Sequence, residues 1–534
     1  MSHKTRSGIE LKTVYTPEDS KGFDYAKQLN DPGHFPFTRG RSSGGKGSWV
    51  QRGLSGEGDA SRSNKQLKYL IQHGQTGVDI IGDSPTMLCM DPDHPFAIPN
   101  VGTQGVSLCC LNDNIQLLKG IPLETISISN SIPNVFALAG LYLVAKKTGV
   151  DLTKVRGSLV QSPFFFEDCG YTTHLPFPLR YRLSLDSIEF SLQNLPKFHS
   201  FMEDAYFFSE TGLTSDEEIA FGLVEVRYVL KGLLKRGVAI DDFASQIVVL
   251  VNCGMDFFEE IAKIRATRRI FARMMRDEFG ATNPRSQSLT MTCHTSGISL
   301  TAQQPFNNIV RGTIQSMALV MAGIQAIEIS AFDEAFRTPS PESHLVALRT
   351  QQVIDLETGI GKVHDPFGGS YMVEKLTDQV EEKIMTRIRQ IEGMGDPADL
   401  STSGWFKKYF ENSMDRYHQD METMSRVKIG ANVLQMPPHD DTMLRDVSYE
   451  KIQPYTWQIE QIREYKRLRE PGLIKDVLIE LRQTARDTKD NLMPCILKAF
   501  EAGATCGEII GMLRMAYGRP YDPYGMVTPP FSEA

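Results

Sequence analysis

Short apolar runs rich in β-branched residues alternate with longer amphipathic stretches from about residue 77 to residue 393. This alternation is typical of parallel strands joined by covering helices. We expect strands at residues 78–82, 126–130, 157–161, 199–203, 247–252, 288–293 and 326–330, with an eighth near Val363. We expect helices at residues 132–147, 216–236, 255–279, 306–322 and 343–358. Seven or eight such units over about 320 residues favour a closed α/β fold, a (β/α)8 TIM barrel, over an open sheet.

The two ends of the chain lack this alternation. Residues 31–58 are dense in Gly, Ser, Pro, Arg and Lys, which predicts a loop or an arm. Residues 393–470 are charged and irregular, and residues 474–504 regain helical periodicity. We therefore expect an N-terminal arm over residues 1–64, a barrel over 65–395, and a linker followed by a helical region over 396–534.

Composition narrows the class of protein. The 534 residues carry a formal net charge of −8, without the basic field that binds nucleic acid. There is no apolar stretch of about 20 residues and no secretory signal, so we expect a cytoplasmic protein without a membrane span. The eight cysteines form no CxxC pair, and neither a disulfide framework nor a metal site is predicted.

Active sites of barrel enzymes lie at the carboxyl ends of the strands. His294 directly follows one expected strand, where it either contacts a ligand or packs as a structural residue. Glu334 and Asp333 follow another, where carboxylates either hold sugar hydroxyls or pair with Arg337.

Two further groups have open interpretations. Lys46 lies among glycines that either cradle a phosphate or form a flexible loop. Arg180 and Arg182 flank Tyr181, where an arginine in a partly dry pocket suits a carboxylate ligand and a solvated arginine has no such role.

Several longer runs resemble the methylmalonyl-CoA mutase family, of the large-subunit type that includes 2-hydroxyisobutyryl-CoA and isobutyryl-CoA mutases. The runs, spread over nearly the whole chain, are PFTRG (36–40), GIPLETISIS (120–129), LPKF (195–198), EIAKIRATRR (260–269), HTSGISLTAQQPFNNIVR (294–311), AFDEA (331–335) and DPFGGSYMVEKLT (365–377). The resemblance implies a barrel whose axis holds coenzyme A. It also implies an isomerase that uses adenosylcobalamin to rearrange the carbon skeleton of an acyl-CoA by radical chemistry.

The cobalamin domain of this family carries a DxHxxG signature, and none of the eleven histidines follows an aspartate by two residues. The resemblance therefore implies that this chain has no cobalamin-binding domain. A separate small subunit with that signature would supply it, in a hetero-oligomer with paired large subunits.

The resemblance also assigns roles to single residues. Glu210 and Glu334 match carboxylates that hold the adenosyl ribose, and Tyr206 matches a tyrosine over the substrate. Arg285 matches a basic residue that contacts a coenzyme A phosphate, and the Gly-rich arm around Lys46 replaces a coenzyme A segment. Arg182 falls where carboxylated substrates find a cationic partner.

Other positions depart from the family. Leu54 replaces a tyrosine that presses on the substrate, and Gly82 replaces an aromatic residue. Val160 and Phe207 replace the glutamine and histidine that bind the thioester carbonyl, and His294 stands where a glutamine is usual. Smaller side chains at Leu54 and Gly82 should enlarge the acyl pocket.

The sequence thus predicts the large subunit of a mutase for an acyl-CoA bulkier than methylmalonyl-CoA, such as a substituted succinyl-CoA or malonyl-CoA held by Arg182. One alternative is a mutase for a neutral branched or hydroxylated acyl-CoA, of 2-hydroxyisobutyryl or pivalyl type, with Arg182 pointing elsewhere. Another is a degenerate subunit that binds without catalysis, because Val160 and Phe207 cannot donate hydrogen bonds to a thioester.

Overall fold

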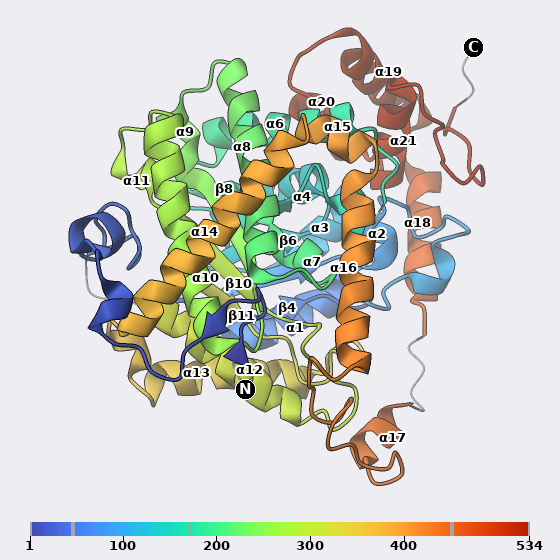
Figure 1. The fold of residues 1–534 in the computed structure, drawn as a ribbon. Coiled ribbons are helices and arrows are strands. Elements are labelled where there is room, and N and C mark those ends of the chain that lie inside the picture. The colour runs from blue at the N-terminus through green and yellow to red at the C-terminus, as the bar shows by residue number, and fades with distance from the viewer. Residues whose placement is uncertain (1–2, 44–47, 171, 449–452, 532–534) are drawn as a thin grey trace. The chain divides into compact units, whose positions relative to one another are not determined.

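The computed structural model describes residues 3–43, 48–170, 172–448 and 453–531. The chain divides into two compact units. Unit 1 comprises residues 1–53 and 202–450, and unit 2 comprises residues 54–201 and 451–534. Figure 1 labels the elements, and their bounds are given below.

One sheet of nine strands runs in the order β3-β11-β10-β9-β8-β7-β6-β5-β4. The strands are β3 (Val50–Arg52), β4 (Leu54–Ser55), β5 (Gly77–Ile81), β6 (Ser127–Ser131), β7 (Arg156–Gln161), β8 (Phe198–Asp204), β9 (Ile247–Cys253), β10 (Thr290–Thr295) and β11 (Ala326–Glu328). The edge strands β3 and β4 are separated along the chain by Gly53 alone, so one interrupted strand provides both edges. The sheet therefore closes into the expected (β/α)8 barrel.

The closing strand corrects one prediction. No strand forms near Val363, which is 56% exposed and follows a short 3₁₀ helix at Ile360–Lys362. The eighth strand position is instead filled by Val50–Ser55, a stretch that we expected to belong to an irregular arm. The remaining seven strands lie within two residues of their expected bounds.

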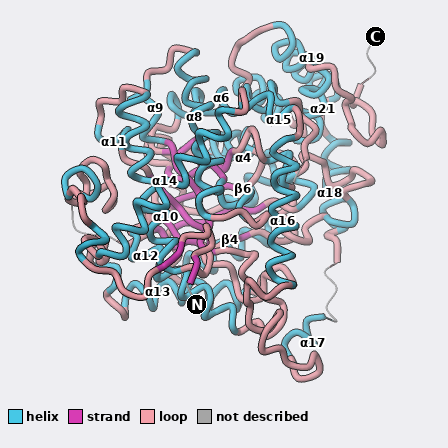
Figure 2. The backbone as a smooth tube through the Cα atoms, in the orientation of Figure 1, coloured by secondary structure: helices cyan, strands magenta, loops and turns pink. Residues whose placement is uncertain are grey.

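Unit 1 contains β3, the end of β8 and β9 to β11, together with most of the helices that Figure 2 draws in cyan. They are α7 (Ala205–Ser209), α8 (Ser215–Lys235), α9 (Ile240–Phe243), α10 (Phe257–Arg273), α11 (Pro284–Gln287), α12 (Asn307–Ala322), α13 (Pro341–Leu356), α14 (Tyr371–Gly393), α15 (Pro397–Thr402), α16 (Trp405–Glu422) and α17 (Thr442–Ser448). The long α14 packs across α8 and α10 (Figure 1). A short antiparallel hairpin of β1 (His3–Lys4) and β2 (Glu10–Leu11) begins this unit.

The helix α16 lies in a segment that we expected to be an irregular linker. Its buried positions Phe406, Phe410 and Tyr417 repeat at helical spacing, although polar and charged residues occupy most of the rest of the helix. Phe406 and Phe410 pack against Phe221 of α8, with ring centroids 5.7 and 5.6 Å apart. Burial of these rings therefore fixes α16 on α8.

Unit 2 combines the strands β4 to β7 with helices from both ends of its sequence. These are α1 (Ala60–Gln72), α2 (Ser84–Met87), α3 (Leu111–Leu118), α4 (Asn134–Lys147), α5 (Phe166–Cys169), α6 (Phe177–Asn194), α18 (Thr456–Leu468), α19 (Pro471–Asp487), α20 (Met493–Ala502) and α21 (Cys506–Ala516). Ile128 of β6, Leu138 of α4 and Leu478 of α19 belong to one buried cluster. The C-terminal helices thus share a hydrophobic core with the strands of this unit.

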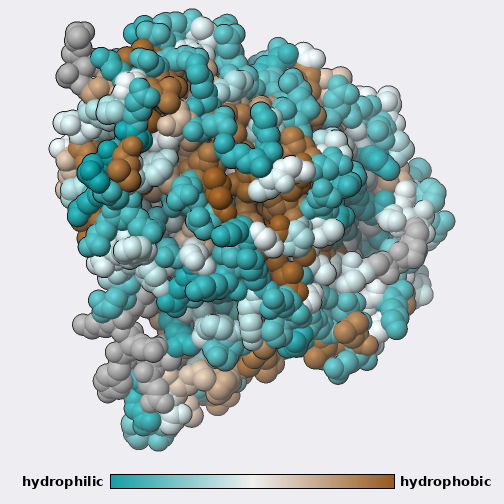
Figure 3. Space-filling model, turned by 180° about the vertical axis from the view of Figure 1, so that it is seen from behind, coloured by the Kyte–Doolittle hydropathy of each residue, from teal (hydrophilic) through white to brown (hydrophobic). Residues whose placement is uncertain are grey.

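The surface and the cysteines agree with a globular α/β protein. On the face drawn in Figure 3, hydrophilic residues predominate and hydrophobic residues form separate areas among them. None of the described helices combines the length and the apolar composition that crossing a bilayer requires. All eight cysteines are free thiols.

Gly157 of β7 leaves no room for a side chain beside β6. A Cβ atom at this position would lie 1.7 Å from the carbonyl oxygen of Ile128 on β6, and the φ angle is +154°. We predict that Gly157→Ala lowers the free energy of unfolding by about 3 kcal/mol or more, because backbone on both strands must move. Urea unfolding followed by circular dichroism measures this loss.

Gly393→Ala is the matched control. Gly393 ends α14, and a Cβ atom added to it would meet no other atom within 4 Å. Its replacement should change stability by less than about 1 kcal/mol. Equal unfolding midpoints for the two variants would contradict the close strand approach.

Candidate active site

The carboxyl end of β8 begins the candidate site in unit 1. Directly after the strand, Asp204 accepts a hydrogen bond from the backbone N–H of Phe207 at 3.1 Å and starts the short helix α7. Tyr206 lies within this short helix, and Glu210, four residues later, caps its C-terminal end. Both were expected to be functional residues.

Tyr206 lies against His294 at the end of β10. The two ring centroids are 4.4 Å apart, with an angle of 43° between the planes. A Cβ atom on Gly297 would lie 3.3 Å from the Tyr206 hydroxyl and 3.0 Å from a Glu210 carboxylate oxygen, so a larger residue would crowd both side chains. Burial, with the charge of Glu210, raises the pKa of Tyr206, which keeps the phenol protonated.

Glu210 connects the ends of three strands. Its carboxylate accepts hydrogen bonds from Asn252 Nδ2 on β9, from Ser296 Oγ at 2.9 Å, and from the backbone N–H of Ile298. Burial raises the pKa of Glu210, and these three donors oppose that rise by stabilising the charged form.

Asn252 is itself held by a buried charge network. Its backbone N–H donates to Glu218 at 2.8 Å, and its carbonyl accepts from Lys263 Nζ at 2.7 Å. Lys263 pairs with Glu218 at 3.0 Å and with Glu260 at 2.6 Å. Burial alone would lower the pKa of Lys263, but the two carboxylates raise it. The network fixes the amide that contacts Glu210.

His294 is a neutral hydrogen-bonding group. Burial lowers its pKa to about 3, although Glu328 Oε1 lies 3.9 Å from Nε2. Ser330 Oγ is 3.2 Å from Nε2 and donates its proton to the Thr295 carbonyl at 2.8 Å. Nε2 of His294 is therefore the protonated nitrogen, and Nδ1 is an acceptor.

Glu334 and Asp333 have different environments. Asp333 accepts from Arg337 Nε at 2.9 Å and from the Ser340 backbone N–H at 3.0 Å. Glu334 Oε2 accepts from the Ala331 backbone N–H at 3.0 Å, and burial raises its pKa to about 7. Asp333 is therefore the carboxylate that pairs with Arg337, and Glu334 can still accept hydrogen bonds from a ligand.

The strands β9 and β10 divide their side chains between two faces. His294 and Asn252 are register partners, whereas Cys293 and Cys253 fall on the alternate positions. Cys253 Sγ donates to the Gln315 carbonyl of α12 at 3.6 Å, which places the thiols on the helix side of the strands. Burial raises the pKa of both cysteines.

Arg285 lies at the opposite end of β10 from His294. It is exposed on α11, and its charge lowers the pKa of the half-buried Arg41 beyond the effect of burial. Arg41 donates to Thr290 Oγ1, where β10 begins. Lys46, the other residue expected near coenzyme A, lies outside the described residues.

The remaining expected residues belong to unit 2. Gln161 of β7 donates to Ser187 Oγ of α6 at 3.0 Å, so its side chain is on the helix side and Val160 is on the opposite face. Leu54 lies half-buried on β4. A Cβ atom on Gly82 would lie 2.8 Å from Thr86 Cγ2, so the side chain of Thr86 on α2 packs against this position. The larger acyl pocket expected from Gly82 stays a prediction.

Arg182 donates its hydrogen bonds to the C-terminal region of unit 2. It donates to the carbonyl of Ala485 at 2.8 Å and of Asp490 at 2.7 Å, and it lies 3.7 Å from Asp186. Arg180 instead lines a cavity of about 80 Å³ that Val160 also lines, and it lies 3.9 Å from Glu167.

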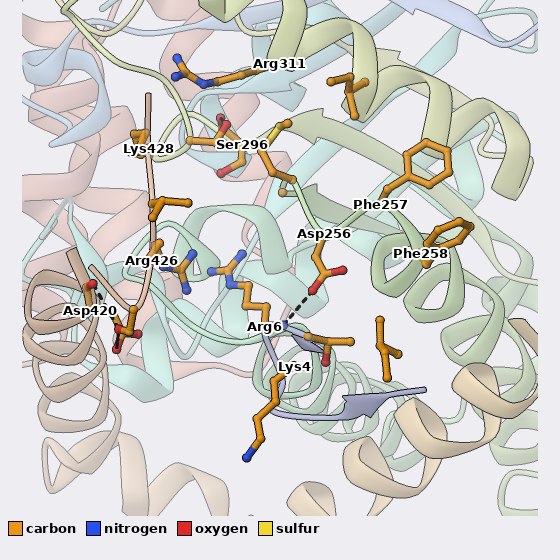
Figure 4. A pocket seen from close by; sticks show the side chains of 18 of the residues that line it. Lys4, Arg6, Asp256, Phe257, Phe258, Ser296, Arg311, Asp420, Arg426 and Lys428 are labelled. Carbon is orange, nitrogen blue, oxygen red and sulfur yellow. Dashed lines mark hydrogen bonds between the residues drawn. The ribbon is translucent and has the colours of Figure 1, made fainter. Parts of the chain in front are cut away.

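A large cavity of about 1420 Å³ opens in unit 1 beside Ser296 and Ile298 (Figure 4). Its lining comes from the β1–β2 hairpin, the loop after β9, the first turns of α12 and residues 425–429. Sequence reasoning did not predict that the β1–β2 hairpin and residues 425–429 would line a cavity. It also missed Asn252, although that residue closes an expected strand.

Raised carboxyl pKa values predict a fall in stability as the pH rises. The pKa of Glu334 increases from 4.5 to about 7 on folding, so the folded chain retains a proton that the unfolded chain has released. The resulting stabilisation is complete below pH 4.5 and is lost as the pH rises through 7. We predict that Glu334→Gln reduces the loss between pH 5 and pH 8.5 by roughly 2 kcal/mol.

Urea unfolding at several pH values measures this change. Glu342→Gln, on the exposed first turn of α13, is the control and should leave the pH dependence unchanged. Parallel stability profiles for the wild type and Glu334→Gln would refute the raised pKa.

Comparisons with known proteins identify the family. Residues 4–519 match the family model for methylmalonyl-CoA mutase. The chain is 35% identical to the 2-hydroxyisobutanoyl-CoA mutase large subunit of Aquincola tertiaricarbonis, over 91% of this chain and 87% of that protein. It is 33% identical to methylmalonyl-CoA mutase of Rhizobium meliloti, over 96% of this chain and 72% of that protein. The chain therefore belongs to the methylmalonyl-CoA mutase family and is an acyl-CoA mutase, an isomerase.

Proposed function

We propose that the chain is the large subunit of an adenosylcobalamin-dependent acyl-CoA mutase. A separate small subunit with the DxHxxG signature would carry the corrin, in a cytoplasmic hetero-oligomer with paired large subunits. The similar protein from Aquincola tertiaricarbonis is named as a large subunit, which supports a two-subunit arrangement.

The observation that carries the proposal is that different groups lie at the two ends of β10. Arg41 and Arg285 lie near its first residue, and His294, Tyr206 and Glu210 lie near its last. Six extended residues span about 20 Å. This arrangement suits an elongated thioester whose phosphates lie at one end of the strand and whose acyl group lies at the other.

The acidic residues fit the ribose of the cofactor. A carboxylate offers about four acceptor positions. Glu210 uses three of them, and Glu334 uses one on described residues. Each glutamate can therefore accept a hydrogen bond from a ribose hydroxyl. When bound, adenosylcobalamin supplies the radical chemistry that removes a hydrogen atom from the acyl group and returns it.

The chain's own residues would orient the substrate and exclude water. Tyr206 stays protonated beside the neutral His294, so neither side chain exchanges protons readily near neutral pH. Glu210 anchors the loop that follows β10. Positioning of this kind serves a radical rearrangement, which requires no general base.

A neutral branched or hydroxylated acyl-CoA is our proposed substrate. Arg182, the expected partner of a substrate carboxylate, directs its donors to Ala485 and Asp490. Val160 presents an apolar surface on the strand face opposite Gln161. Similarity to the 2-hydroxyisobutanoyl-CoA enzyme supports the same class.

A carboxylated acyl-CoA is the second candidate. Arg180 lines a small cavity together with Val160, and its ion pair with Glu167 is long, at 3.9 Å. An arginine in a half-dry cavity suits a bidentate carboxylate. On this alternative, Arg180 takes the role that we first assigned to Arg182.

Isomerase assays test the proposed function. The purified chain, a matching cobalamin subunit and adenosylcobalamin are combined with neutral branched, hydroxylated and dicarboxylic acyl-CoA thioesters. We expect rearrangement of at least one neutral thioester, detected by mass spectrometry of the products. If the small subunit binds tightly but no thioester is rearranged, the chain is a binding subunit and the proposal fails.

Variants of the two arginines separate the substrate classes. Arg182→Gln should lower stability by about 1–3 kcal/mol, through loss of its hydrogen bonds, and leave the preference among thioesters unchanged. For a neutral substrate, Arg180→Gln should change kcat/KM less than about threefold. For a carboxylated substrate it should lower kcat/KM about 100-fold, because a charged hydrogen bond is lost. A shift of thioester preference in Arg182→Gln would contradict our assignment.

A further inference from the structure

Two arginines from distant parts of the sequence meet in the large cavity of unit 1. Arg6 comes from the β1–β2 hairpin and Arg426 from the loop after α16. Figure 4 shows their guanidinium groups directed toward one another across the cavity. Their proximity is also evident in the pKa of Arg426, which burial lowers and the charge of Arg6 lowers further.

Neither guanidinium forms an ion pair with an acidic side chain in the described part of the chain. Nε and Nη2 of Arg6 and Nε of Arg426 are buried without a hydrogen bond. Arg426 lies over the ring of Tyr417, 4.9 Å from its centroid, a contact of the guanidinium face that gives its buried Nε–H no acceptor. Buried donors without acceptors are unfavourable, and two converging like charges add to that cost.

The backbone holds Arg6 in this position. Its N–H donates to Asp256 at 2.9 Å, and the N–H of Ser7 donates to Glu259 at 3.1 Å. Nη1 lies 3.4 Å from the position of a Cβ atom on Gly254, so a glycine leaves room for the guanidinium. The hairpin is thus anchored to the loop after β9 while the side chain extends into the cavity.

The loop that carries Arg426 is fixed by two further cations. Lys428 Nζ donates to Tyr417 Oη at 2.9 Å and to the carbonyl of Ile298 at 2.5 Å. Arg311 Nη2 donates to the carbonyl of Ile429 at 2.8 Å. Burial, with the charges of Arg311 and Arg426, lowers the pKa of Lys428 to about 8. Each of these side chains adds positive potential to the cavity.

The charge of Asp420 opposes the fall in the pKa of Arg426 and the charge of Arg6 opposes the rise in the pKa of Glu210, but no carboxylate of the described residues forms an ion pair with either guanidinium. Asp256 is bound by the backbone of Arg6, and Asp420 accepts from Ser425 Oγ at 2.9 Å. A fork of N–H donors from each of two arginines matches the oxygens of a tetrahedral anion. We propose that Arg6 and Arg426 bind a phosphate-type oxyanion, either free or as the phosphoryl group of a nucleotide, with Lys428 reinforcing the field.

This site is additional to the proposed mutase function. It uses cationic residues of the hairpin and the loop, whereas the ribose acceptors Glu210 and Glu334 are acidic. Anion binding can be measured on the full chain without the small subunit, adenosylcobalamin or an acyl-CoA. Failure of the anion site would therefore be distinguishable from failure of the mutase assay.

Calorimetric titration of the full chain tests the proposal. Orthophosphate, pyrophosphate, ADP and adenosine are titrated at constant ionic strength in chloride buffer. Saturable binding of orthophosphate or pyrophosphate identifies a free oxyanion as ligand. Tighter binding of ADP, without binding of adenosine, identifies a nucleotide phosphoryl group. Absence of saturable binding for all three phosphates overturns the proposal.

Variants assign the binding to the two arginines. Arg6→Gln and Arg426→Gln should each weaken phosphate affinity about 10- to 100-fold. Arg6→Lys and Arg426→Lys keep the charge without the fork of donors and should show intermediate affinity. They provide the test if the Gln variants fold poorly. Arg349→Gln removes an exposed arginine of α13 and should bind as the wild type does. Unchanged affinity in both Gln and both Lys variants would refute the assignment.

Discussion

A single buried carboxylate aligns the ends of successive strands in unit 1. Glu210 follows β8, and its hydrogen-bond donors come from the end of β9 and from the loop after β10. Because each donor is fixed by its own strand or turn, the carboxylate determines the spacing of the residues around it. The contact between Tyr206 and His294 depends on that spacing, and so does any ligand placed over the two rings.

Hydrophobic periodicity was sufficient to predict most of the barrel. The strands β5 to β11 consist mostly of buried residues, which is the expected pattern for a parallel sheet covered by helices. Val50–Ser55 escaped prediction because Gly53 interrupts it and the polar residues Gln51 and Arg52 are buried within it. Only the closure of the sheet gives such a short, polar stretch its strand partners.

The residues of the candidate site differ in how far the sequence alone could predict their positions. Hydrophobic periodicity predicted that His294 and Glu334 follow strands, and the structure places both there. The resemblance to a family added Glu210, whose role stays a prediction. Arg182 could not be placed in this way, because its direction depends on helices some 300 positions later in the sequence. Arg6 carried no local signal either, because its significance arises only from the loop that brings Arg426 opposite it.

The division of β9 and β10 into two faces has a chemical consequence. A thiol gives up its hydrogen atom to a carbon radical readily, so a cysteine beside such a reaction would intercept it. Cys253 and Cys293 occupy adjacent strands only one position away from Asn252 and His294, but Cys253 Sγ is turned toward the Gln315 carbonyl of α12 and Cys293 Sγ toward the backbone carbonyl of His294. A slip of one residue in either strand would exchange the faces and expose a quencher to the interior. If the chain runs the radical rearrangement that we propose, the register of these two strands protects that reaction as well as shaping the barrel.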